Sequence, residues 1–309
     1  MLVEHHFRAM NTEVGVWLWS AAPTAKRILA EVAQMFADVE SQLSRFRADS
    51  ELCRLNARAG RGAVTVSPLL YRVLAQALSA ARQTDGIFDP TLLPQLRQAG
   101  YDRSFELLAD TSDDNPLLPV QPSGSGWRQV CLDPANSTVE LPAGVAIDLG
   151  GIGKGWTVDR ASELLAEWGP SLVDAGGDMR ASGLPGGESW PVALEDPFHP
   201  ERDLLTLALN DCAVATSTIG KRHWQRNGER FHHLIDPRTG TSADSDLHTA
   251  TALAPSAMEA EVAAKTALFL GSVAGAAWLG SKANPAILIQ HSGQSTTIGQ
   301  LPLWKRDDQ

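Results

Sequence analysis

The densest group of chemically capable side chains lies in residues 231–240, which read FHHLIDPRTG. This order places an imidazole, the Asp236 carboxylate, the Arg238 guanidinium and the Thr239 hydroxyl on one short turn. An imidazole titrates near neutral pH, so the set suits binding of a polar ligand or transfer of a proton. Taken singly, none of these residues is informative. The run DPRTG is typical of an ordinary turn, and a histidine before it could have a purely structural role.

A second candidate is the glycine-rich stretch of residues 146–155, AIDLGGIGKG. Residues 145–149 are predicted to form a short buried strand, the glycines a turn, and the apolar residues that follow one face of a helix. Glycine amides and a helix N-terminus favour an anion, and Lys154 adds a positive charge where a phosphate would lie. Neither the Walker formula nor the dinucleotide fingerprint is met, so a tight turn with an exposed lysine is the alternative.

Two further segments carry charge. Residues 84–91 form a compact turn with two carboxylates and a phenylalanine, for which a purely structural role is the simpler interpretation. Residues 260–271 are predicted to be a late helix, on which Glu261 and Lys265 are four residues apart. They therefore share a face and could simply form an ion pair, while Glu261 could still ligate a hard cation.

The elements that must position these groups indicate an α+β fold, because many strands accompany two or three long helices without a βαβ repeat. Residues 109–126 lack periodicity and are predicted to be a surface loop. Residues 171–183 are predicted to form a strand interrupted by a Gly-Gly pair, which marks a bulge or a close backbone approach. The other expected elements are strands at 13–19, 190–194 and 204–209 and helices at 24–43 and 68–84.

Composition limits the class of protein. The 309 residues are 43% hydrophobic and 20% charged, which indicates one large domain or two intimate lobes. A net charge of −10 argues against a nucleic-acid binder, so any phosphate must be held locally. Three scattered cysteines fit a reducing compartment. With no membrane span or signal peptide expected, the cytoplasm is the predicted location.

Six segments, in this order, resemble the signature set of the ApbE family, the FAD:protein FMN transferases. They are MNT at 10–12, TDGIFDP at 84–90, DLGGIGKG at 148–155, DAGGD at 174–178, ATS at 215–217 and HLIDPRTG at 233–240. The resemblance spans roughly residues 7 to 290. Each motif is weak alone, whereas six in order are specific.

The resemblance implies an ApbE-like enzyme that binds FAD and transfers FMN to a Thr or Ser hydroxyl of an acceptor protein, releasing AMP. It implies that His233 is the base that deprotonates this hydroxyl. The residues implied at FAD are Met10, Phe46, Ile87, Phe88, Asp89, Asp148, Lys154 and Ile235.

The resemblance also implies a Mg²⁺ ion held by the Gly151 carbonyl and by an Asp and a Thr on the late helix. In the ungapped register those two positions are Glu261 and Lys265, while a shift of one residue would bring Thr266 to a different face. A charged ammonium has no lone pair and cannot ligate a cation. Either Lys265 replaces the metal as counter-charge to the phosphates, or the protein binds FAD without transferring FMN. An FAD pyrophosphatase, in which water replaces the acceptor, is a third alternative.

Overall fold

The computed structural model describes residues 1–108, 126–226 and 229–305. The chain divides into two compact units. Unit 1 comprises Met1–Ala37, Lys154–Thr218 and Asp246–Gln309, and unit 2 comprises Asp38–Gly153 and Ile219–Ser245. The loop expected at 109–126 lies, except for its last residue, outside the described residues.

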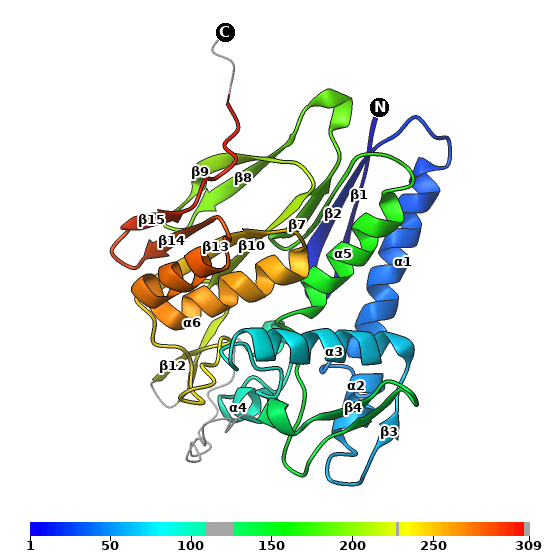
Figure 1. Ribbon diagram of the computed structural model, residues 1–309, viewed down its shortest axis with the longest axis vertical. Coiled ribbons are helices and arrows are strands. Elements are labelled where there is room, and N and C mark those ends of the chain that lie inside the picture. The colour runs from blue at the N-terminus through cyan, green and yellow to red at the C-terminus, as the bar shows by residue number, and fades with distance from the viewer. Residues whose placement is uncertain (109–125, 227–228, 306–309) are drawn as a thin grey trace. The chain divides into compact units, whose positions relative to one another are not determined.

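Unit 1 is built on an eight-stranded sheet in the order β1-β2-β6-β7-β10-β13-β14-β15 (Figure 1). Every neighbouring pair is antiparallel. The strands are β1 (Leu2–Ala9), β2 (Thr12–Trp19), β6 (Ser171–Ala175), β7 (Asp178–Ser182), β10 (Cys212–Thr218), β13 (Leu247–Ala254), β14 (Ala286–Gln290) and β15 (Ser295–Ile298).

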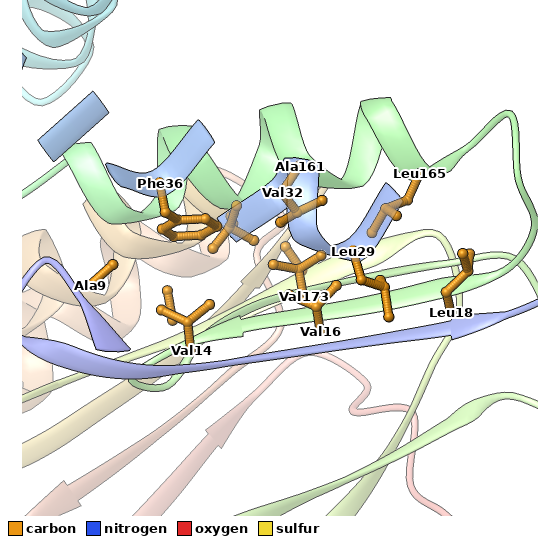
Figure 2. Close-up of a cluster of buried hydrophobic side chains, with 14 of the residues drawn as sticks. Ala9, Val14, Val16, Leu18, Leu29, Val32, Phe36, Ala161, Leu165 and Val173 are labelled. Carbon is orange, nitrogen blue, oxygen red and sulfur yellow. The ribbon is translucent and has the colours of Figure 1, made fainter. Parts of the chain in front are cut away.

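One face of this sheet is covered by helices. Side chains alternate between the faces of a strand, so Val14, Val16 and Leu18 of β2 point to the same side. They pack there against apolar residues of α1 (Ala25–Leu43) and α5 (Gly153–Leu165), including Phe36 and Leu165, as Figure 2 shows. This buried cluster fixes the position of α5, whose first turn carries Lys154.

The other face is covered by a hairpin of β8 (Trp190–Asp196) and β9 (His199–Leu209). Val214 of β10 packs on this side, together with Trp190, whereas its neighbours Ala213 and Ala215 face the helices. A short 3₁₀ turn, η3 (Pro185–Gly187), precedes β8. The central strands are therefore buried on both faces.

The long helix α6 (Ala257–Ser281) begins at Ser256, whose side chain accepts a hydrogen bond from the Glu259 amide, and packs against β10 and β13. Gly271 interrupts its helical geometry with φ 81°. Among the described residues it is the one helix long and apolar enough to cross a membrane. Half of that stretch is buried in the protein, and core helices meet the same criteria, so this is weak evidence for a span.

Unit 2 consists of one longer helix, α3, and several short elements. Its helices are α2 (Glu51–Asn56), α3 (Pro68–Gln83), α4 (Leu93–Gln98) and the 3₁₀ turns η1 (Phe105–Leu107) and η2 (Gly126–Gln129). A three-stranded sheet has the order β3 (Val64–Thr65), β5 (Thr138–Glu140), β4 (Cys131–Asp133), and β11 (His223–Arg226) pairs with β12 (Glu229–His232).

Most expected elements are confirmed, and the fold is α+β as predicted. The strand predicted at 145–149 is wrong, since only Ala146 forms a bridge, to Leu92. The amide and carbonyl of Ile147 instead bond to the Asn56 side chain, so no strand partner is needed. The predicted interruption at 176–177 is the turn of the β6–β7 hairpin, which makes two strands of the one expected.

Candidate functional site

Lys154, Glu261 and Lys265 are brought together in unit 1. The ammonium of Lys154 pairs with Asp178 and lies 3.5 Å from Oε1 of Glu261, and Nζ of Lys265 lies 3.8 Å from the same oxygen. The amide of Gly155 donates a 3.1 Å hydrogen bond to Oε2 of Glu261. The ion pair predicted between Glu261 and Lys265 is therefore confirmed, and the alternative of an exposed Lys154 is wrong.

Close packing of α5 on α6 makes this cluster feasible. A Cβ added to Gly155 would lie 2.7 Å from the Ala257 carbonyl oxygen and 2.8 Å from Cα of Met258. Only glycine lets the two backbones approach this closely, and the approach brings the Gly155 amide to Glu261. In return Asp159 of α5 accepts hydrogen bonds from the first two amides of α6, those of Ala257 and Met258.

Burial dominates the electrostatics around the cluster. The Asp178 side chain is 4% exposed, and loss of hydration raises its pKa to about 7 despite the neighbouring Lys154. Burial likewise raises the pKa of Asp174, on the adjoining strand, and the pKa of Asp159. Arg180 donates a 2.9 Å hydrogen bond to Asp159, which offsets part of the effect of burial on the pKa of this carboxyl.

The donor set does not fit a divalent cation. Glu261 lies beside two ammonium groups and accepts the Gly155 amide, so Mg²⁺ at this carboxylate would meet two positive charges, and Lys265 offers it no lone pair. Among the described residues no group of three His, Cys, Asp or Glu side chains is arranged for a metal. Gly151, the remaining expected ligand, belongs to unit 2.

Unit 2 places Phe46, Asp148 and Ile235 around a row of aromatic rings. The row consists of Phe46, Tyr101 and Trp224. The Arg45 guanidinium pairs with Asp148 at 3.0 Å and lies over the rings of Phe46 and Tyr101, at 4.1 and 4.4 Å from their centroids. Tyr101 contacts Trp224 at 5.4 Å between centroids, and both belong to the buried cluster that contains Ile235. Phe46 is 39% exposed, so its ring is available to a planar ligand.

Arg45 adds a polar feature to this row. Its side chain is 5% exposed, Nη1 donates to the Tyr101 carbonyl at 2.7 Å, and Nη2 is buried without a hydrogen-bond partner. Sequence reasoning missed Arg45, although it adjoins Phe46. It also left Asp178 out of the site, although Asp178 follows a Gly-Gly pair inside a quoted motif.

The turn after α3 is shaped by hydrogen bonds of its own residues. Thr84 accepts the Phe88 amide at 3.0 Å, while Oδ1 of Asp89 accepts the amide and hydroxyl of Thr91. Phe88 and Asp89 are buried, and Ile87 is half-buried. These contacts are those of a structural turn, and only Ile87 of the three expected ligand residues offers substantial surface.

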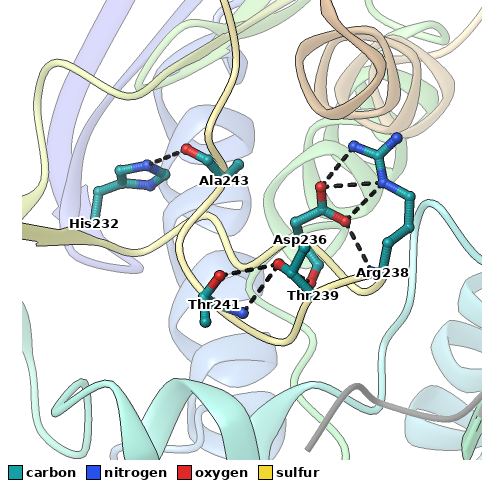
Figure 3. Close-up of polar contacts among 6 residues, drawn as sticks. All are labelled: His232, Asp236, Arg238, Thr239, Thr241 and Ala243. Carbon is teal, nitrogen blue, oxygen red and sulfur yellow. Dashed lines mark hydrogen bonds and ion pairs between the residues drawn. The ribbon is translucent and has the colours of Figure 1, made fainter. Parts of the chain in front are cut away.

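Two adjacent histidines at the end of β12, His232 and His233, lie in different surroundings. Nε2–H of His232 donates to the Ala243 carbonyl at 3.0 Å, as Figure 3 shows. Nδ1 of the same ring accepts the Leu234 amide at 3.3 Å. Burial lowers the pKa of His232, so this ring is a neutral structural group. His233 is half-buried on the same segment.

The same segment holds a carboxylate beside a guanidinium. Asp236 is buried and takes two hydrogen bonds from Nε and one from Nη2 of Arg238, the shortest at 2.6 Å (Figure 3). These bonds raise the pKa of Arg238, which stays charged. The pair braces the turn that carries His233.

Met10 forms the β1–β2 turn of unit 1 together with Asn11. Both residues have positive φ, 52° and 57°, and Ala9 pairs with Thr12 across them. This conformation is uncommon for methionine and stores strain of about 1 kcal/mol or more. The Met10 side chain packs at the edge of the core cluster between helices and sheet.

Comparison with known proteins places the chain in a family. The model of the ApbE family matches residues 10–289. The chain therefore belongs to the ApbE family. It is 34% identical to the FAD:protein FMN transferase of Treponema pallidum, over 85% of this chain and 77% of that protein.

Solved structures agree with this assignment. The ApbE protein of Thermotoga maritima superposes with a TM-score of 0.84 at 26% identity, covering 96% of this chain and 97% of that one. The flavin transferase ApbE of Vibrio cholerae gives a TM-score of 0.81 at 25% identity, with the same coverage. The predicted family and fold are confirmed.

Proposed function

We propose that this chain is an FAD:protein FMN transferase. The observation that carries the proposal is the similarity to the Treponema pallidum enzyme of that name over most of both chains, within a family match of residues 10–289. FAD is the donor substrate, and a second protein is the acceptor. The acceptor group is a Thr or Ser hydroxyl, and the cytoplasm stays the predicted location.

The proposed step balances without a redox partner. The acceptor oxygen bonds to the phosphorus of the FMN moiety, and the bond from that phosphorus to the bridging oxygen breaks. AMP leaves with the bridging oxygen, and the acceptor proton passes to a base. The groups needed are a base within reach of the hydroxyl and positive charge near the diphosphate.

We assign the base role to His233. Its neighbour His232 uses both ring nitrogens to hold the segment, so it has no free position for a proton. His233 is carried on a turn that Asp236 and Arg238 brace. Among the FAD-binding roles, Lys154 supplies charge, Phe46 and Ile235 supply apolar surface in unit 2, and Met10, Ile87, Phe88, Asp89 and Asp148 complete the proposed set.

The test is incubation of purified protein with FAD and a candidate flavoprotein acceptor, followed by in-gel flavin fluorescence and measurement of AMP. Fluorescent acceptor together with AMP supports the proposal. AMP without a labelled acceptor would identify an FAD pyrophosphatase, and FAD binding without either product would identify a protein that lacks transfer.

His233→Ala tests the base assignment. Loss of a positioned base is expected to slow transfer by about 10²-fold or more with little change in FAD affinity. His199→Ala, which alters an exposed histidine of β9, is the matched control and is expected to react at the normal rate. Transfer at full rate by His233→Ala would show that the base is another group.

A further inference from the structure

Two ammonium groups converge on one buried carboxylate oxygen in unit 1. Nζ of Lys154 and Nζ of Lys265 lie 3.5 and 3.8 Å from Oε1 of Glu261, and Asp178 holds Lys154 from a second side. The negative charge of Glu261 is therefore balanced by ammonium groups of the chain itself. These cations are covalently attached, so they are present whatever the ionic composition of the solvent.

Exposure decides which charges a ligand meets. The side chains of Glu261 and Asp178 are 5% and 4% exposed, whereas those of Lys154 and Lys265 are 20% and 14% exposed. The carboxylates therefore lie beneath the amines and orient them. An anion that approaches from solvent meets positive charge first.

A divalent cation would have to displace this arrangement. Mg²⁺ binds carboxylate oxygens at about 2.0–2.1 Å, well inside the present separations between Glu261 and either amine. It would meet two positive charges within a few ångströms, where burial weakens the screening of their repulsion. Lys265, one helical turn from Glu261, offers no oxygen in return.

Lys154 also stands in the first turn of α5, a helix of 13 residues that starts at Gly153. The dipole of a helix N-terminus favours an anion, and the two lysines add full charges beside it. The chemistry matched by this combination is a diphosphate. FAD carries one in the bond that the proposed reaction breaks.

We infer that Lys154 and Lys265 supply to the FAD diphosphate the positive charge that a divalent cation would otherwise supply, so that this chain binds FAD without a metal at the cluster. The inference rests on the proposed function. It makes Lys265 a binding residue for the diphosphate.

The first test uses the wild-type protein after removal of metals with EDTA. FAD binding, followed by quenching of flavin fluorescence, is expected to change by less than about twofold between EDTA and excess Mg²⁺. The electron paramagnetic resonance signal of free Mn²⁺ is expected to be undiminished when the protein is added without FAD. This second readout does not depend on activity.

The second test removes one ammonium. Lys265→Thr is expected to weaken FAD binding in EDTA about tenfold, since one charge beside the diphosphate is lost. Lys265→Arg keeps the charge and is expected to retain most of the affinity. Lys282→Thr, at the exposed C-terminal end of α6, is the matched control and is expected to bind as wild type does.

The outcomes separate the two proposals. FAD binding that requires Mg²⁺, uptake of Mn²⁺ by the wild type, or an unchanged affinity in folded Lys265→Thr would overturn the inference and leave the transferase function standing. Absence of FAD binding in both EDTA and Mg²⁺ would overturn both. If circular dichroism shows Lys265→Thr to be unfolded, the wild-type measurements alone decide.

Discussion

The close contact between α5 and α6 at Gly155 predicts that replacing this glycine by alanine lowers the stability of the protein substantially. In Gly155→Ala the new Cβ would lie 2.7 and 2.8 Å from the carbonyl oxygen and carbon of Ala257, and 2.8 Å from Cα of Met258. Carbon atoms prefer separations of about 3.5–4.0 Å, so the helices must part by most of an ångström. The obstacle is backbone on both sides, which leaves no rotamer to relieve it.

The cost is the sum of three terms. Overpacking against backbone costs about 1–3 kcal/mol. Parting the helices also weakens the Gly155 hydrogen bond to the buried Glu261, and such bonds to charged groups contribute about 1.5–3 kcal/mol. Alanine recovers about 1 kcal/mol of helix propensity. The net loss is roughly 3 kcal/mol, or about 5 °C in melting temperature for a chain of this size.

The assay is thermal unfolding of ligand-free protein, followed by circular dichroism. Gly153→Ala is the matched control, because a Cβ at Gly153 meets nothing within 4 Å in the same helix turn. The control is expected to melt within about 1 °C of wild type or slightly above it. Equal losses in both variants, or no loss in Gly155→Ala, would refute the packing argument.

Two further predictions concern unit 2. Arg45→Met leaves Asp148 without its partner in a largely buried position and is expected to cost about 3 kcal/mol in urea unfolding, whereas Arg103→Met at an exposed ion pair should cost under about 0.5 kcal/mol; similar costs for the two would contradict the burial argument. For His232 the lowered folded pKa means that the unfolded chain binds more protons, so its stabilisation is present above pH 6.5 and is lost as pH falls below that value. Melting temperatures between pH 7 and pH 5 should therefore fall less in His232→Gln than in wild type, and an identical slope would show that His232 is not the titrating group.

The regular elements were predictable because their signals are local. A Ser cap, a proline in the first turn and a continuous apolar stripe indicate the helix of residues 68–83. The ion pair of Glu261 and Lys265 follows from their spacing on one helix turn. The family resemblance then supplied the function, which no single segment carries.

What the sequence could not predict depends on partners distant in the chain. Residues 145–149 have the apolar character of a strand, but Asn56, 91 positions away, satisfies the backbone of Ile147. The Gly-Gly pair at 176–177 is compatible with a bulge or a hairpin, and only the pairing of β6 with β7 decides between them. The joining of Lys154 to Asp178 and Glu261 likewise depends on the close approach that Gly155 permits.

A carboxylate on each of the helices α5 and α6 accepts hydrogen bonds from the other helix, and this has a mechanical consequence. Each helix satisfies amides in the first turn of the other, Asp159 those of Ala257 and Met258, and Glu261 that of Gly155. A slide of either helix by one residue would break all three bonds at once, so the two helices shift as a single body. These reciprocal hydrogen bonds thus set the spacing of Lys154 and Lys265. The spacing persists through any motion in which α5 and α6 move together.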